Sequence, residues 1–413
     1  MIAAARGGWS DRQILDAIYA ATGSQQITFK LDVVRDGIRL RSIPGTGEVS
    51  LNRFADIQRI ARLELYEPLD WLRDEIKPYM LLRMNDGISS QSIIVQTCAE
   101  RDALDFTCAE WDALDFTCAE LDAGVITAAK RTVRYAEFPL GLFIPSTPTR
   151  TSVDGQDVWS VEAYDHTIIL EEDCITEPLY FAQGTTYLSA IQSILVSAGI
   201  EVVFVQDFSN LALPAERIFE IGLNKRSIIN TLLSEINFNS IYCNADGVFI
   251  ISKYVEPSAA SVSGRYLANE MSIIGRDTES SIDYYKAPNV FIAICDNPDL
   301  NESYVSVRVN DNPASPFSTI QRGRRITSEL YRPDAIASQE ALDAYIRRIA
   351  FEVTNERYEQ LIFETGLNPL HERAEVLELS HPDATGIFVE SGWTIPLDHE
   401  GMMRHEVRRL LLL

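Results

Sequence analysis

The sequence predicts a β-rich α+β chain of several domains: a β-region, a small α/β module and a second β-region. Three observations support this. A length of 413 residues is enough for roughly two to four domains. Runs that alternate apolar and polar residues, as half-buried strands do, lie on both sides of the middle of the chain. In the middle itself, two amphipathic helical patterns flank a strand pattern.

The first β-region is predicted over residues 24–165, after an N-terminal helical segment within 1–23. Ser10 can cap a helix over 10–21. Residues 27–34 alternate apolar and polar side chains, as a half-buried strand does. Further strand patterns cover 47–54, 59–67, 78–84, 138–150 and 158–165. Their spacing favours an antiparallel barrel or a small sandwich.

An insertion at 87–136 takes the place of a short hairpin loop in this β-region. It contains a ten-residue repeat over 97–124 that is rich in acidic residues. A pentapeptide solenoid would have too few units to bury a core. A helix would turn its stripe by about 80° from one copy to the next. Two interpretations remain: an exposed acidic insertion, or a contact site for a neighbouring subunit or a cell-surface ligand, anchored by Phe106, Trp111 and Phe116.

The α/β module is predicted over 166–255, and the second β-region over 256–413. Helices are predicted over 185–199 and 224–237, where a threonine or asparagine can cap an apolar stripe. A strand over 200–205 and a hairpin over 240–254 complete the module. After a predicted linker over 256–265, strand patterns return at 288–295, 303–310, 359–367, 374–380 and 401–413. Ser338 can cap the clearest helix, predicted over 338–357.

Charge and motifs argue against several kinds of chemistry. The net charge of −24 disfavours nucleic-acid binding, which needs clustered Lys and Arg. The sequence has no G-x-S-x-G elbow, P-loop or G-x-G-x-x-G. The segments that begin at His371 ("HERAE") and His405 ("HEVRR") start like a zinc-protease motif but lack its second histidine. We therefore expect structural histidines, no catalytic residue, no metal and no cofactor. No run of about 18 apolar residues exists, so no membrane span is expected.

Several phrases together resemble one family. Segments 70–84, 138–150 and 158–165 ("DWLRDEIKPYMLLRM", "FPLGLFIPSTPTR", "VWSVEAYD") resemble the N-terminal region of tail proteins of tailed bacteriophages. The C-terminal region of the same proteins is similar to segments 310–325, 342–352 and 392–409. The family is the baseplate hub, or tail-tip hub, also called the tail-associated protein.

The resemblance implies two β-barrel-like hub domains joined by smaller α/β modules. It also implies a homotrimer, in which two similar barrels per chain form a pseudo-sixfold ring that docks on the tail tube. Implied partners are distal tail or baseplate ring proteins, the tube protein, the tape measure protein and receptor-binding or fibre proteins. DNA would pass through the channel during ejection without specific binding. The expected location is the virion tail tip, after synthesis in the host cytoplasm.

Alternative functions remain open. A hub of a phage-derived particle, such as a gene transfer agent or an injection machine, would have the same architecture. A cell-wall hydrolase and a stand-alone carbohydrate-binding module belong to other classes. Many relatives carry cell-wall-degrading modules in a long C-terminal extension, whereas this chain ends soon after "HEVRR". Hydrolase activity is therefore not expected.

Overall fold

The computed structural model describes most of the chain, in two compact units. The described residues are 8–19, 26–84, 89–94, 125–130, 134–153, 155–207, 209–267, 273–283, 285, 287–297 and 303–410. The smaller unit combines residues 5–27 and 81–137, and the larger unit holds almost all the rest. Phe106, Trp111 and Phe116 lie outside the described residues, together with the whole repeat.

The smaller unit begins with helix α1, Asp11–Ile18. Ser10 caps α1 through a reciprocal capping box with Gln13, which is the cap that the sequence predicts. Strands β6 (Ser89–Ile94) and β7 (Val125–Lys130) pair antiparallel. They lie within the predicted insertion, on either side of the repeat.

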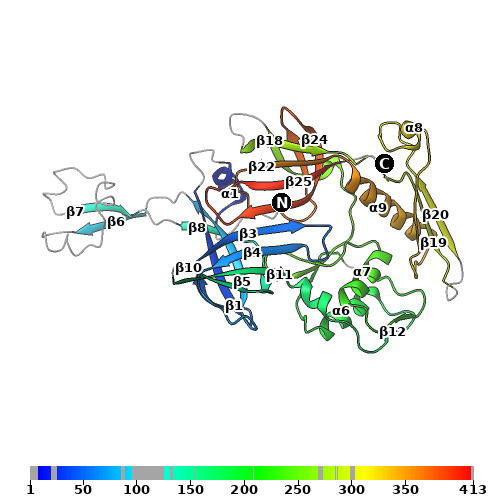
Figure 1. Cartoon of the computed structure of the whole chain (residues 1–413), viewed down its shortest axis with the longest axis horizontal. Helices are drawn as coiled ribbons and strands as arrows, with labels where there is room; N and C mark the ends of the chain where they lie inside the picture. The colour runs from blue at the N-terminus through cyan, green and yellow to red at the C-terminus, as the bar shows by residue number, and fades with distance from the viewer. Residues whose placement is uncertain are drawn as a thin grey trace. The chain divides into compact units, whose positions relative to one another are not determined.

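One large sheet organises the chain, and its strands are coloured from both ends of the sequence (Figure 1). The N-terminal half contributes β1 Ile27–Arg35, β2 Ile38–Ile43, β3 Gly45–Asn52, β4 Arg59–Leu65, β5 Glu75–Met84, β8 Arg134–Pro139, β9 Phe143–Pro145, β10 Thr149–Val153 and β11 Gln156–Asp165. The C-terminal half contributes β17 Val262–Leu267, β18 Ile274–Ser281, β22 Gln360–Thr365, β23 Val376–Ser380, β24 Thr385–Pro396 and β25 Met403–Arg409.

The strand order of this sheet is β18-β22-β25-β24-β3-β4-β11-β9-β5-β1-β2. Strand β10 pairs with β11, β8 with β5, β23 with β24 and β17 with β23. Among the described residues the strands follow one open path, without a closed barrel. The fold is therefore β-rich and multidomain, as the sequence predicts.

The seam between the two halves is the antiparallel pair β24–β3, in which Gly392 lies opposite Asn52 and Pro396 opposite Glu48. A Cβ atom at Gly392 would lie 2.6 Å from the carbonyl oxygen of Leu51. Real Cβ contacts do not come this close, so glycine lets the two strands approach. Trp393 and Leu51 are both buried at this seam, which makes it part of the core.

The α/β module contains three helices around one apolar core. Its elements are α5 Thr167–Glu172, β12 Leu179–Phe181, α6 Tyr187–Ser197, β13 Val203–Val205, β14 Arg217–Phe219, α7 Lys225–Glu235, β15 Tyr242–Cys243 and β16 Phe249–Ile251. The side chains of Thr186 and Asn224 accept hydrogen bonds from the first turns of α6 and α7. These caps confirm the helices predicted over 185–199 and 224–237.

A separate three-stranded sheet packs on the longest helix, and α9 lies beside β19 and β20 (Figure 1). Its elements are β19 Val290–Cys295, β20 Tyr304–Val309, α8 Thr319–Arg322, β21 Thr327–Tyr331 and α9 Gln339–Arg357. Ser338 caps α9 as predicted, and its side chain accepts from the Ala341 N–H.

The linker predicted over 256–265 was wrong. A short 3-10 helix, η1 (Ala259–Ser261), is followed there by β17, which pairs parallel with β23. Small and polar residues dominate this stretch, so its strand character is weak in sequence. Tyr266 is nevertheless buried and pairs β17 with the core of the second half. Among the described residues, no helix is both long and apolar enough to cross a lipid bilayer.

Candidate functional site

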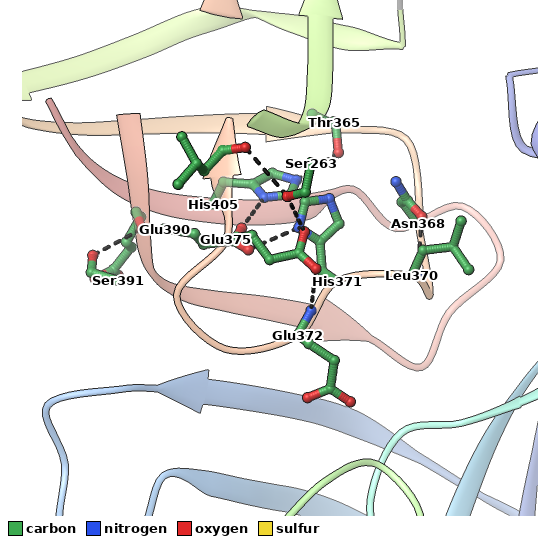
Figure 2. Close-up of polar contacts among 12 residues, drawn as sticks. Ser263, Thr365, Asn368, Leu370, His371, Glu372, Glu375, Glu390, Ser391 and His405 are labelled. Atoms are coloured by element: carbon green, nitrogen blue, oxygen red, sulfur yellow. Dashed lines mark hydrogen bonds and ion pairs between the residues drawn. The ribbon is translucent and has the colours of Figure 1, made fainter. Parts of the chain in front are cut away.

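Two histidines and a glutamate form a buried cluster in the second half of the sheet. Glu390 lies on β24, His405 on β25, and His371 in the loop between β22 and β23. Both Nδ1 atoms lie 2.8 Å from Glu390, His371 at Oε2 and His405 at Oε1 (Figure 2). All three side chains are at most 2% exposed. The carboxylate therefore joins a strand, its neighbour and a loop at one point.

The outer nitrogens of the two rings also have partners. His371 Nε2 is paired with the Tyr266 hydroxyl from β17, and His405 Nε2 lies 2.8 Å from Thr365 Oγ1 of β22. Asn368 donates a 3.2 Å hydrogen bond to the same tyrosine oxygen. Four strands and one loop thus share a single polar network. A network with all its ring nitrogens paired specifies how these elements fit together.

Charge is distributed unequally over the cluster. Burial lowers the pKa of both histidines, but for His371 the attraction of Glu390 outweighs burial and the pKa is raised. Burial and the charge of His371 leave the pKa of His405 lowered. The two histidines overcome the effect of burial on Glu390, whose pKa is lowered. We interpret the cluster as a His371–Glu390 ion pair with a neutral His405 that donates to the same carboxylate.

The cluster has the residue types of a metal site, with one ligand atom from each of three residues within 4.8 Å of one another. However, both Nδ1 atoms lie at hydrogen-bond distance from the carboxylate that would be the third ligand. A metal ion would have to replace both hydrogen bonds. The geometry favours a structural network, which agrees with the structural histidines that the sequence predicts. Sequence analysis singled out His371 and His405 separately and did not detect that they meet at Glu390.

Arg59 joins three parts of the larger unit. This side chain on β4 is 2% exposed, donates to the Leu140 carbonyl at 2.7 Å, and pairs with Glu372 at 2.8 Å. Its guanidinium lies 5.2 Å from the ring of Trp393 on β24. The other oxygen of Glu372 accepts from the Ala245 N–H of the α/β module at 3.3 Å. Through this ion pair the first half, the second half and the module are held together.

A second buried ion pair connects the α/β module to the loop before α9. Arg217 donates to Glu235 at 2.9 Å and pairs with Asp334 at 3.2 Å. The Tyr187 hydroxyl donates to Glu235 at 3.0 Å. Burial raises the pKa of Glu235 to about 7, against the opposing effect of Arg217. Beside this pair lies an open polar hollow of about 440 Å³, lined by residues that include Arg217 and Asp334.

The raised pKa of Glu235 predicts a pH-dependent stability. The folded state binds this proton more tightly than the unfolded chain, whose carboxyl titrates near 4.5. The contribution is complete below pH 4.5 and is lost as the pH rises through about 7, roughly 3 kcal/mol in all. We expect Glu235→Gln to flatten the loss of stability between pH 5 and pH 8 in thermal melts. Glu216→Gln, at an exposed position beside the same hollow, should keep the wild-type slope; equal slopes for all three proteins would contradict the prediction.

A groove of about 520 Å³ runs over the seam, on the face of β4, β3, β24 and β25. Its charged side chains are paired: Arg62 contacts Glu48 and Glu162, each at 3.3 Å, and Arg404 contacts Glu406 at 3.5 Å. Neither this groove nor the hollow beside Glu235 is lined by a histidine or a cysteine of the described chain. Both are surfaces of balanced charge without an activated nucleophile or base.

The residues that the sequence proposed for contacts, Phe106, Trp111 and Phe116, belong to the part of the repeat that the structure does not describe. Their role therefore stays a prediction. The described residues instead point to strand seams and buried polar junctions, which sequence patterns within one element do not reveal.

No family model matches the sequence, and no curated protein matches it. Solved structures do match. A tail protein from Neisseria meningitidis MC58 aligns over 92% of this chain and 96% of its own, with a TM-score of 0.58 and 10% identity. The chain has the fold of a tail protein. The 43 kDa tail protein of prophage MuSo2 from Shewanella oneidensis aligns over 92% and 98%, with a TM-score of 0.54 and 9% identity. The tail-protein fold thus spans both halves and the α/β module, and the resemblance stated from sequence is confirmed at the level of fold.

Proposed function

We propose that this chain is a structural baseplate or tail-tip hub protein of a tailed phage. In this role it forms a trimeric ring that closes the tail tube and provides a channel for DNA ejection. The observation that carries the proposal is the tail-protein fold, which extends over nearly the full length of both this chain and the solved tail proteins. The site geometry fits this role, because its buried charges join strands and modules to one another.

The proposed architecture has two β-barrel-like hub domains, over 24–165 and 256–413, with the α/β module of 166–255 between them. The seam β24–β3 supports this layout, since it joins the two halves edge to edge as two units of one ring would be joined. The proposed partners are distal tail or baseplate ring proteins, the tail tube, the tape measure protein and receptor-binding or fibre proteins.

Charge is compatible with a channel for DNA. A trimer of chains with net charge −24 carries −72, and a wall of the same sign as DNA does not retain it. Mapping charge on an experimental trimer tests this point: an acidic lumen is expected, and a lumen lined by Lys and Arg would contradict it.

Purification of the protein followed by sedimentation analysis and electron microscopy tests the proposed function. The expected result is a particle of three chains with a central hole, located by antibody labelling at the end of a phage tail. A monomer that is absent from purified particles would reject it. A cleared band on a peptidoglycan zymogram would instead favour the hydrolase alternative.

The insertion supplies a separate prediction. We expect that deletion of residues 88–135 leaves the melting temperature of the remaining chain nearly unchanged, because long insertions in hairpin loops cost little entropy and decorate the sheet. Replacing Phe106, Trp111 and Phe116 with alanine in the full chain should also leave melting unchanged. Loss of host-cell binding by phage particles that carry this triple variant would identify the repeat as a contact site. Cooperative unfolding lost on deletion would show that the insertion belongs to the core.

A further inference from the structure

The two halves of the chain repeat one strand plan. In the N-terminal half, the neighbours are β3-β4-β11-β10, and in the C-terminal half they are β18-β22-β25-β24. Every neighbouring pair in both series is antiparallel. In both series the first two strands precede the last two in sequence, and the last two are joined in the reverse spatial order. The halves are therefore two copies of one unit, although their sequences show no repeat.

The units are joined inside the chain by one edge of each. Strand β24, the last in the order of the second unit, pairs with β3, the first of the first unit. The corresponding edges at the other ends belong to β10 and β18. Among the described residues, β10 pairs with β11 alone and β18 with β22 alone. Each unit thus offers the edge that its counterpart uses at the seam.

These two edges cannot pair within the sheet as it stands, because β18 and β10 lie at opposite ends of the eight strands that make up the two units. Repeating the seam at these ends requires a second copy of the chain. The same contact repeated head to tail between identical chains produces a closed ring when the rotation per step allows it. Three chains would supply six units joined by six equivalent seams, three within chains and three between them.

Exposure and charge agree with such pairing. Residues 149–152 of β10 are exposed, and Arg150 is the only charged residue of that strand. Strand β18 is largely exposed and contains Asp277 and Glu279 against one arginine, Arg276. Exposed edge strands without proline are templates for strand addition by another chain. A basic edge and a mainly acidic edge favour each other over self-pairing.

We propose that β10 of one copy pairs antiparallel with β18 of a second copy, as β24 pairs with β3 inside the chain. This inference rests on the trimeric hub proposed above and names the contact that closes its ring. The buried positions Ala61 and Leu63 of β4 correspond to Leu361 and Phe363 of β22. Matching them gives a register for the new seam.

In this register Thr149 corresponds to Thr394, and Ser281 corresponds to Ser50, which is the partner of Thr394 at the seam. Thr151 of one copy therefore lies opposite Glu279 of the next. The adjacent pair is Arg150 with Ser280.

Disulfide cross-linking tests the contact. Opposite residues of an antiparallel pair have Cβ atoms about 4.5–5.5 Å apart, close enough for a disulfide. We expect Thr151→Cys with Glu279→Cys to give covalent dimers and trimers on a non-reducing gel after mild oxidation, which reductant reverses. Arg150→Cys with Ser280→Cys covers the alternate hydrogen-bonding position in the ladder. Mixing the two single variants Thr151→Cys and Glu279→Cys should give dimers only.

The matched control pairs Thr151→Cys with Arg39→Cys, which lies on the exposed edge strand β2 at the other end of the sheet. It should remain at the background that the unmodified protein, with its own cysteines, gives. Sedimentation under reducing conditions checks that each variant assembles like the unmodified protein. A trimer that neither cysteine pair cross-links overturns this contact and leaves the proposed hub intact. A protein that is monomeric both in solution and in particles overturns both.

Discussion

Replacing Glu390 with alanine is expected to lower the melting temperature by on the order of 10 °C, which corresponds to a loss of roughly 3–5 kcal/mol. Glu390 accepts hydrogen bonds from two buried histidines and compensates the charge of His371. Its removal leaves that charge buried without a partner, in a part of the core where water cannot replace the carboxylate. Differential scanning calorimetry would measure the shift.

Two further variants separate this cause from a general effect of mutation. Glu390→Gln keeps the shape and one acceptor, so an intermediate loss is expected. Glu378→Ala removes a glutamate from the neighbouring strand β23, where the side chain is 43% exposed and pairs with Arg265. That control should change stability by less than about 1 kcal/mol. Equal shifts for Glu390→Ala and Glu378→Ala would contradict the network as described.

Local patterns predicted the helices well. The sequence places a cap residue and an apolar stripe together at each of α6, α7 and α9, and the structure confirms all three. Strands with one buried face, such as β4, were also predicted, because Ala61, Leu63 and Leu65 alternate with more exposed residues. Where the chain determines its structure within one element, the sequence is sufficient.

Strand β24 escaped prediction for a physical reason. Six consecutive residues, 388–393, are buried, so the strand has no alternating pattern, and Gly386 and Gly392 weaken its strand character further. Its place between β25 on one side and β23 and β3 on the other is a property of the whole sheet. The candidate site was missed for the same reason: Glu390 is 19 residues from His371 and 15 from His405, and only the sheet brings them together.

Replacing Arg59 with methionine is expected to cost roughly 2–4 kcal/mol. Methionine keeps much of the volume and the contact with Trp393, so the loss isolates the polar interactions. The buried carbonyl of Leu140 loses its donor, and Glu372, 313 residues away in sequence, loses its cation. We also expect faster proteolysis of the α/β module, because Glu372 is the group that accepts from Ala245.

The same strand provides the control. Arg62 pairs with two glutamates, but its side chain is 56% exposed, so Arg62→Met should change stability by no more than about 1 kcal/mol. Adding Glu372→Gln to Arg59→Met should recover part of the loss, since the second change removes the uncompensated carboxylate. If Arg59→Met behaves like Arg62→Met, and the double variant recovers nothing, the ion pair does not join the two halves. The joining contact would then be the apolar and backbone pairing of β24 with β3 alone, which is the same kind of contact that we propose between copies.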